Sequence, residues 1–343
     1  MALVLAGISA RNVYLSHATL TPVHSEEECA QILSASLPAL RAVRALESKP
    51  RYRDCLAMTS ALLGVPEQDV PVEVLVPSAA ARRRRPGLHC PVWSGPLFPG
   101  AICRVRTGPG EEPIHVVSPA LHFLLRCREL DATQALLLAF QLCGTYELRA
   151  DLDCGFGTRT PQAHGDALRQ AVHSLAPGAP GTDVARSAAD RVIDGSASPR
   201  ESGFATFAVT PRRSGGAGLP SPLLNHRVEL TPRARVHLPE NQAIRYDFYW
   251  PEKRLACEYD SSWWHDDPRR RGSDDRRRLA ARALGDDLVG MARETLSIPS
   301  MTDVLVDDLA LVLRGRRPDP LSPSSARRRG SLHGTCFGRH RWW

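Results

Sequence analysis

Lysine is nearly missing from this sequence of 343 residues, since Lys49 and Lys253 are the two lysines among 44 basic residues. Such a preference for arginine is what GC-rich coding produces, so the abundance of arginine does not by itself indicate nucleic-acid binding. The formal charge is +7, and residues 314–343 carry the whole excess, with eight arginines against one aspartate. Because the rest of the chain is net neutral, we expect contact with polyanions only through this tail and local basic clusters.

Long apolar stretches are also missing. No part of the sequence approaches the ~20 apolar residues that a membrane-spanning helix needs. The first residues include no basic leader followed by a cleavage site. With 43% hydrophobic and 24% charged residues, the composition is typical of a globular protein. We therefore expect a cytoplasmic protein with no membrane partner.

Paired cysteines and phosphate loops do not occur. The nine cysteines are scattered, contain no CxxC pair and are odd in number. This pattern argues against both a disulfide framework and a zinc knuckle, and we expect free, buried thiols. Neither GxxxxGK[ST] nor a complete GxGxxG is present, which argues against the usual nucleotide-binding loops.

The pattern of apolar residues predicts an α/β (α+β) fold with two domains. Residues 1–165 combine helical periodicity with short β-branched runs such as 70–77, which predicts a mixed α/β N-terminal domain. Proline and glycine between residues 175 and 182 are the strongest interdomain signal, so we interpret 166–195 as a linker with a helix.

The remaining sequence predicts a second domain and a tail. Residues 196–313 read as helix, paired strands, helix, strand and helix, an order that suits a small mixed sheet flanked by helices. Residues 314–343 are rich in arginine, serine and glycine, and we expect them to be a disordered basic tail.

A strong helix start opens this second domain. Ser198 is predicted as the N-cap, Pro199 as the first helical residue, and Glu201 as the third. The Glu201 side chain is then placed to reach back to the Ser198 amide, as in a capping box.

Three acidic residues follow on a predicted hairpin formed by strands 244–250 and 254–260. If the turn is centred between Glu252 and Lys253, Asp247 lies directly opposite Glu258, where like charges repel unless a cation neutralises them. Asp260, two residues beyond Glu258, points to the same face. Carboxylate oxygens suit Mg²⁺ or Mn²⁺, ions that also bind phosphates and activate water.

Two alternatives stay open at this point. A register shifted by one residue would place Cys257 opposite Asp247. The acids could also be solvent-facing residues of an edge strand, which is the ordinary interpretation of such a pair. The surrounding run LACEY favours a buried strand, where a glutamate is normally paired or bound to metal.

Three segments carry a resemblance to a known family: SPRES, YDFYWPEKRLACEYDSSWWH and DDRRRLAARALG. Together they resemble the C-terminal module of actinobacterial proteins that belongs with the very-short-patch-repair endonucleases, in the PD-(D/E)XK nuclease superfamily. The resemblance covers about residues 196–313. It implies a restriction-endonuclease-like fold and a DNA endonuclease that uses Mg²⁺ or Mn²⁺.

The resemblance also implies roles for individual residues. Asp247 corresponds to the central metal ligand, Glu258 and Asp260 complete the acidic cluster, and Glu201 is the helix carboxylate that helps to hold metal-bound water. His265 corresponds to a general acid/base or phosphate contact. Asp260 occupies the place of the superfamily's catalytic lysine, so His265 or an arginine would have to replace that cation.

Aromatic and basic residues near these acids are candidates for DNA contact. Trp263 and Trp264 could stack on bases or wedge into a duplex, although core packing is the simpler role for at least one of them. Arg277 and Arg278 match the family helix that closes over the site and suit a phosphate-contacting surface. A solvated helix face is an equal alternative for these arginines.

The N-terminal domain weakly resembles the antitoxin-like part of AbiEi-type regulators, through VEVLVPS, IHVVSPALHFLLRCREL and LCGTY. This resemblance implies a scaffold or recognition role and a possible toxin–antitoxin partner. The alternative to a DNA endonuclease is therefore a non-catalytic DNA-binding regulator that retains the nuclease fold.

Overall fold

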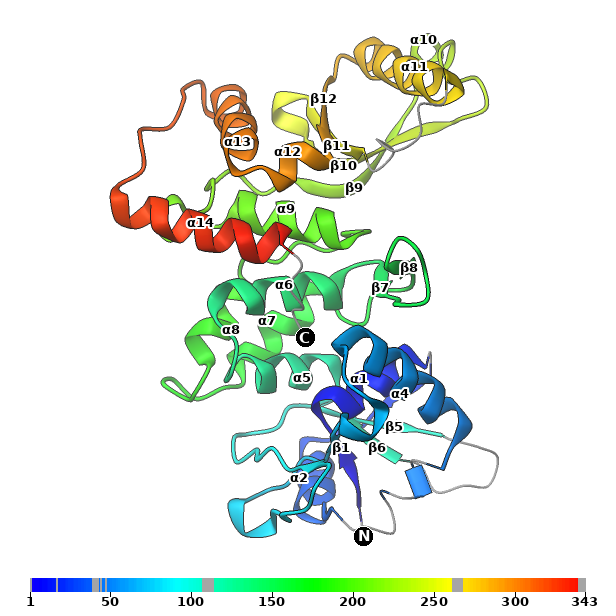
Figure 1. Cartoon of the computed structure of the whole chain (residues 1–343), viewed down its shortest axis with the longest axis vertical. Helices are drawn as coiled ribbons and strands as arrows, with labels where there is room; N and C mark the ends of the chain where they lie inside the picture. The colour runs from blue at the N-terminus through cyan, green and yellow to red at the C-terminus, as the bar shows by residue number, and fades with distance from the viewer. Residues whose placement is uncertain are drawn as a thin grey trace. The chain divides into compact units, whose positions relative to one another are not determined.

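The computed structural model of the chain (Figure 1) describes residues 2–16, 18–38, 43, 45–46, 48–106, 114–260 and 268–338. Within this part the chain forms two compact units, and the expected mixed α+β class with two domains is confirmed. Unit 1 comprises Met1–Leu142 and Tyr146–Asp190, and unit 2 comprises Cys143–Thr145 and Arg191–His340. The chain passes into unit 2 after Asp190, near the end of the expected linker.

In its described residues, unit 1 combines one four-stranded sheet and two two-stranded sheets, β3-β4 and β7-β8, with surrounding helices. Its larger sheet has the strand order β1-β6-β5-β2, with β1 parallel to β6 and the other pairs antiparallel. The first elements of unit 1 are β1 (Val4–Leu5), α1 (Gly7–Leu15), β2 (Leu20–Pro22), α2 (Glu26–Ser34), α4 (Pro50–Leu63), η1 (Glu67–Asp69), β3 (Val72–Glu73), η2 (Ala79–Ala81) and β4 (Leu88–His89). They are followed by β5 (Ile102–Val105), β6 (Ile114–Val117), α5 (Pro119–Arg126), α6 (Ala132–Cys143), β7 (Tyr146–Leu148), β8 (Phe156–Thr158), α7 (Gly165–His173) and α8 (Thr182–Ala189).

The short parallel pair β3–β4 places Glu73 next to His89. The sequence predicts one strand over 70–77, and the structure divides this stretch between several neighbours. Val74 bridges Leu5 and Val76 bridges Val92, beyond the two residues of β3 itself. The β-branched pattern therefore predicts extended backbone correctly but not which segments pair with it.

Unit 2 contains the mixed sheet flanked by helices that the sequence predicts. The strand order is β12-β11-β10-β9, with β11 parallel to β12 and the other pairs antiparallel. Its elements are α9 (Pro199–Val209), η3 (Arg212–Ser214), β9 (Leu223–Glu229), α10 (Pro232–Arg235), β10 (Ala243–Trp250), η4 (Pro251–Lys253), β11 (Leu255–Asp260), α11 (Pro268–Leu284), β12 (Asp287–Ala292), α12 (Arg293–Ser297), α13 (Pro299–Arg314) and α14 (Pro323–Phe337).

The hairpin of β10 and β11 has the predicted register. Phe248 pairs with Cys257, Tyr249 with Ala256, and Trp250 with Leu255. The alternative register, with Cys257 opposite Asp247, is excluded by these pairs.

Helix α9 begins as predicted, with one difference in its cap. The Ser198 hydroxyl accepts a hydrogen bond from the Glu201 amide at 3.2 Å, which confirms the N-cap. The Glu201 carboxylate instead accepts from the Ala197 amide, at 2.8 Å, so the expected bond to the Ser198 amide is wrong by one residue.

The prediction of a disordered tail is wrong for residues 323–337, which form helix α14. This helix lies along α9 (Figure 1), and a Cβ atom added to Gly203 of α9 would come within 2.6 Å of the Cys336 carbonyl oxygen. Leu332, Cys336 and Phe337 are buried at helical spacing. Arg329 is buried too, donating to the Gly215 and Gly216 carbonyls and pairing with Asp303. The basic composition concealed this apolar stripe.

Two broader expectations concern thiols and membranes. All nine cysteines are free and all but Cys154 are buried, as expected. Among the helices of the described residues, none has both the length and the apolar character that a membrane crossing requires.

Candidate functional site

Asp247 lies at an irregular point of strand β10. Tyr246 faces α11, in a core cluster with Ala280 and Ala281, whereas Phe248 contacts Phe204 of α9 edge to face at 4.9 Å. Residues two apart on a regular strand point to the same face, so the facing changes between Tyr246 and Phe248. Asp247 therefore lies at the residue where the strand changes its facing, and its side chain can approach groups from both sides of the sheet.

The Asp247 carboxylate is fixed by the neighbouring strand. Its Oδ2 atom accepts a hydrogen bond from the Tyr259 amide of β11 at 2.8 Å. The side chain thus takes the place of a backbone carbonyl next to the hairpin pair of Phe248 and Cys257. A carboxylate bonded to a backbone amide in this way has little rotational freedom, so its position is set by the sheet.

Glu258 is held by Arg277 of helix α11. The guanidinium group contacts both carboxylate oxygens, with Nε 3.3 Å from Oε2 and Nη2 bonded to Oε1. Nη2 also donates to the Arg245 carbonyl of β10 at 2.9 Å. Arg277, predicted as a DNA contact, therefore binds the acidic cluster itself in this structure.

Glu201 reaches the cluster from α9 and is buried, with 6% of its surface exposed. Its carboxylate accepts from the Ala197 amide and, at 2.6 Å, from the Asn225 side chain of β9. Asn225 has the positive φ of 47° and also donates to the Gly195 carbonyl at 3.0 Å. Asparagine adopts this left-handed backbone more readily than most residues, and here that conformation accompanies a side chain directed at Glu201.

The electrostatics of the cluster favour a bound cation. Burial, together with the negative charges of Glu201 and Glu258, raises the pKa of Asp247 to about 7, against the lowering effects of the Tyr259 hydrogen bond and the charge of Arg277. Burial also raises the pKa of Glu201, partly opposed by its hydrogen bonds. Within the described side chains, Arg277 is the arginine that acts on these carboxylates, and a second positive charge would relieve their repulsion.

A metal ion at this cluster would have few protein ligands. Mg²⁺ commonly keeps several waters and binds through one or two carboxylates, which Asp247 and Glu258 can supply. Across the described side chains, no three His, Cys, Asp or Glu groups lie close enough together to hold a metal ion. The predicted ligand set is therefore not assembled from Glu201, Asp247 and Glu258 in this arrangement, while the side chain of Asp260 lies outside the described atoms.

A pocket of about 270 Å³ opens beside Glu258. Arg277, Asp274 and Arg278 of α11 line it together with Gly290 of β12, which pairs with Glu258 in register. A Cβ atom added to Gly290 would meet only the Arg278 guanidinium, at 4.0 Å. The pocket gives solvent and small ligands access to the Glu258 side of the cluster.

Several predicted site residues lie outside the part of the chain that the structure describes. Trp263, Trp264 and His265 lie outside the described residues, and for Asp260 only the backbone, at the end of β11, is described. Arg278 is exposed and pairs with Asp275 at 3.4 Å. The roles expected of these residues stay predictions.

Sequence reasoning missed two partners of the acids and a further buried acid. Asn225 and the pairing of Arg277 with Glu258 had no distinctive motif. Asp286 is buried and accepts hydrogen bonds from the hydroxyls of Tyr246 and Tyr249, both at 3.0 Å. The spacing of these tyrosines gave no signal, because residues three apart on a regular strand point to opposite faces.

Comparison with known proteins adds no relative. The chain matches no protein-family model, no curated protein and no solved structure.

Proposed function

We propose that unit 2 is a divalent-metal-dependent DNA endonuclease of the very-short-patch-repair type. The observation that carries this proposal is the Asp247 carboxylate, which is held by the Tyr259 amide and has its pKa raised to about 7 by burial and by the charges of Glu201 and Glu258. Such a carboxylate is close to losing its proton at neutral pH, and a divalent cation favours its ionised form. The resemblance of residues 196–313 to nucleases supplies the choice of DNA as substrate.

Each residue of the cluster has a distinct part in the proposed site. Asp247 and Glu258 would hold Mg²⁺ or Mn²⁺, which supplies a polarised phosphate and a water of lowered pKa. The Tyr259 amide keeps Asp247 in place, and the Asn225 side chain holds the Glu201 carboxylate by a hydrogen bond. Arg277 neutralises the charge of Glu258, and in the proposed site its guanidinium group would exchange this partner for a phosphate oxygen of the DNA.

Residues from the end of β11 to helix α11 complete the proposal. Asp260 and His265 are assigned as the further acid and the proton-transferring or phosphate-binding group. Trp263, Trp264 and Arg278 are assigned to DNA contact. These assignments come from the family resemblance and add to the described part of the site.

Nicking of supercoiled DNA tests the proposed function. With Mg²⁺ or Mn²⁺ we expect wild-type protein to nick plasmid and Asp247→Asn to lose at least about 100-fold in rate, because the lost ligand is worth several kcal/mol in the transition state. The matched control is Asp275→Asn, which removes an exposed carboxylate of α11. Equal nicking by wild type and Asp247→Asn, or none by either, would contradict the proposal.

A non-catalytic DNA-binding regulator is the second candidate function, and the bidentate ion pair of Arg277 with Glu258 favours it. This pair already compensates one carboxylate, so a metal ion has to compete with an internal cation. DNA binding in the presence of Mg²⁺ without cleavage, equal in wild type and Asp247→Asn, would select the regulator.

A further inference from the structure

Unit 1 contains two adjoining pockets that share Arg82 and His89. One, of about 620 Å³, is lined by the run 82–85 together with Leu88, His89 and Cys90. The other, of about 270 Å³, extends from Arg82 and His89 to Glu73, Arg126 and Arg128. We call the two together the arginine groove. Arg82 and His89 line both pockets, so the two pockets are neighbours on the surface of unit 1.

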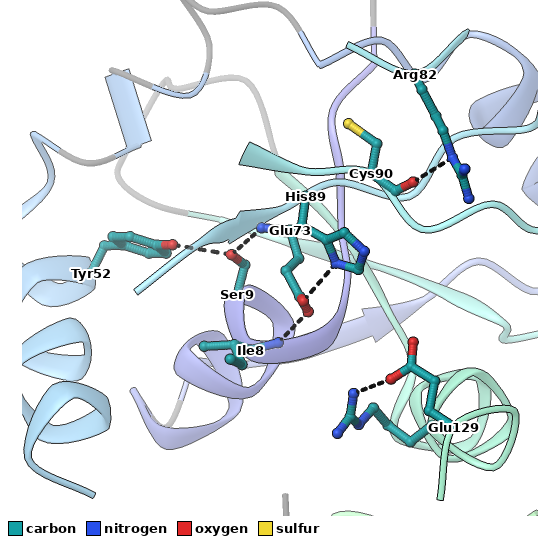
Figure 2. Close-up of polar contacts among 9 residues, drawn as sticks. Ile8, Ser9, Tyr52, Glu73, Arg82, His89, Cys90 and Glu129 are labelled. Carbon is teal, nitrogen blue, oxygen red and sulfur yellow. Dashed lines mark hydrogen bonds and ion pairs between the residues drawn. The ribbon is translucent and has the colours of Figure 1, made fainter. Parts of the chain in front are cut away.

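The carboxylates of the arginine groove are already engaged. Figure 2 shows Glu73 between the Ile8 amide, 2.7 Å from Oε2, and the His89 ring, whose Nδ1 is 2.9 Å from Oε1. The Glu73 amide in turn donates to the Ser9 hydroxyl at 2.8 Å. Glu129 is paired with Arg126. Neither acid is left to neutralise the run 82–85.

Glu73 also fixes the shape of the groove. Gly7 has a φ of +50°, and a Cβ atom placed there would lie 1.2 Å from Glu73 Oε2. The carboxylate therefore occupies the space that any other residue at position 7 would need. Because Nδ1 of His89 faces a carboxylate, it donates, and the ring is held in one orientation at the junction of the two pockets.

The positive charges of the run remain uncompensated. Arg82, Arg83, Arg84 and Arg85 are all exposed, and within the described residues none forms an ion pair with an aspartate or glutamate. Arg82 Nε donates to the Cys90 carbonyl at 3.1 Å (Figure 2), and Arg83 donates to the Arg82 carbonyl. Carbonyl partners leave the guanidinium charge in place for an external anion.

We propose that the arginine groove binds the phosphodiester backbone of DNA, with the run 82–85 contacting successive phosphates. Guanidinium groups bind phosphate oxygens with paired hydrogen bonds, which suits exposed arginines without acidic partners. A single phosphate engages one or two arginines, so four consecutive cations along two joined pockets fit a polymer better than a free nucleotide. The proposal relies on unit 1 alone and does not require that unit 2 cleave DNA.

Binding of a labelled DNA duplex by fluorescence anisotropy in EDTA tests this inference, because cleavage cannot occur without metal. The double variant Arg83→Gln, Arg84→Gln is compared with Arg169→Gln, Arg186→Gln. The control removes the same charge from unit 1, but its arginines pair with Asp166 and Asp183. Thermal unfolding of both variants checks that the fold is kept.

The expected result is a change in the salt dependence of binding. Each lost phosphate contact lowers the slope of log K against log salt by about 0.9, so the groove variant should lose about 1.8 and bind on the order of 10- to 100-fold more weakly near 0.1 M salt. The control pair should keep the wild-type slope.

Three results would overturn the proposal. The first is the absence of duplex binding by the wild-type protein, and the second is an equal loss in the two variants. The third comes from a parallel titration with a nucleoside monophosphate: if this small anion binds and depends on the two arginines while the duplex does not, the groove is a site for free phosphates. Loss of nicking in unit 2 leaves the binding measurement unchanged, so the two proposals fail separately.

Discussion

The two units handle buried carboxylates in opposite ways. In unit 1, Glu73 is fully partnered by a backbone amide and by His89, and arginines nearby are left without acids. In unit 2, Asp247 lies near Glu201 and Glu258, and Arg277 is the arginine that offsets their charge. Among the described residues, the charge without a partner is therefore positive at the run 82–85 of unit 1 and negative at the Asp247 cluster of unit 2.

This difference indicates what each region can bind. The two proposals follow from this difference: surplus arginine in the groove of unit 1 would attract an anion, and surplus carboxylate at the Asp247 cluster would attract a cation. Both deductions depend on which partners the charged groups have, because the body of the protein has no net charge that would favour either ligand.

The largest expected effect on stability tests how tightly Glu73 is built into unit 1. Gly7→Ala should destabilise the protein by about 4 kcal/mol, since the added Cβ atom meets the Glu73 carboxylate and the residue must keep a positive φ. Gly87→Ala is the matched control, because Gly87 has a φ of +70° but nothing within 4 Å of the added atom. It should cost about 1 kcal/mol.

Urea unfolding of the two variants measures the difference. Equal losses of unfolding free energy would mean that the Glu73 carboxylate can move away from α1 at little cost. The orientation of His89 in the arginine groove would then not be fixed by that contact, and the contrast with the crowded acids of unit 2 would be weaker.

A smaller effect is expected from pH in unit 2. The folded-state pKa of Asp247 is about 7, above the unfolded value near 3.9, so between these values the folded state binds more protons than the unfolded chain. The contribution of this residue to the unfolding free energy therefore falls as pH rises, by about 2 kcal/mol between about pH 5 and pH 7.

Comparing wild type with Asp247→Asn isolates this contribution. The asparagine does not titrate, so the variant should gain stability relative to wild type as pH increases across this window. Parallel pH profiles for the two proteins would show that Asp247 ionises without strain, and the cluster would then have no need of a cation.

Local sequence patterns predicted the framework of the site. The turn between β10 and β11 determines the register that leads to Asp247 and Glu258, and Ser198 with Pro199 determines the start of α9. These features depend on neighbouring residues and on the period of strands and helices, which a single sequence displays directly.

Features that depend on distant partners were not predictable. Asn225 contacts Glu201 from another strand, and Arg277 contacts Glu258 from a helix whose charges suited a solvated face equally well. Helix α14 was masked by its arginines, of which Arg329 is buried by three tertiary contacts. The composition of such a segment reflects its many solvent-exposed residues, and it does not reveal the few residues that pack against the rest of the protein.

Titration of Mn²⁺ into the protein, followed by calorimetry, tests the central claim most directly. The account predicts a single site in the wild type, tighter as pH rises through about 7 because Asp247 must be ionised to bind, and lost in Asp247→Asn but kept in Asp275→Asn. Binding that is absent from the wild type, or equal in wild type and Asp247→Asn, would contradict a metal site at this cluster.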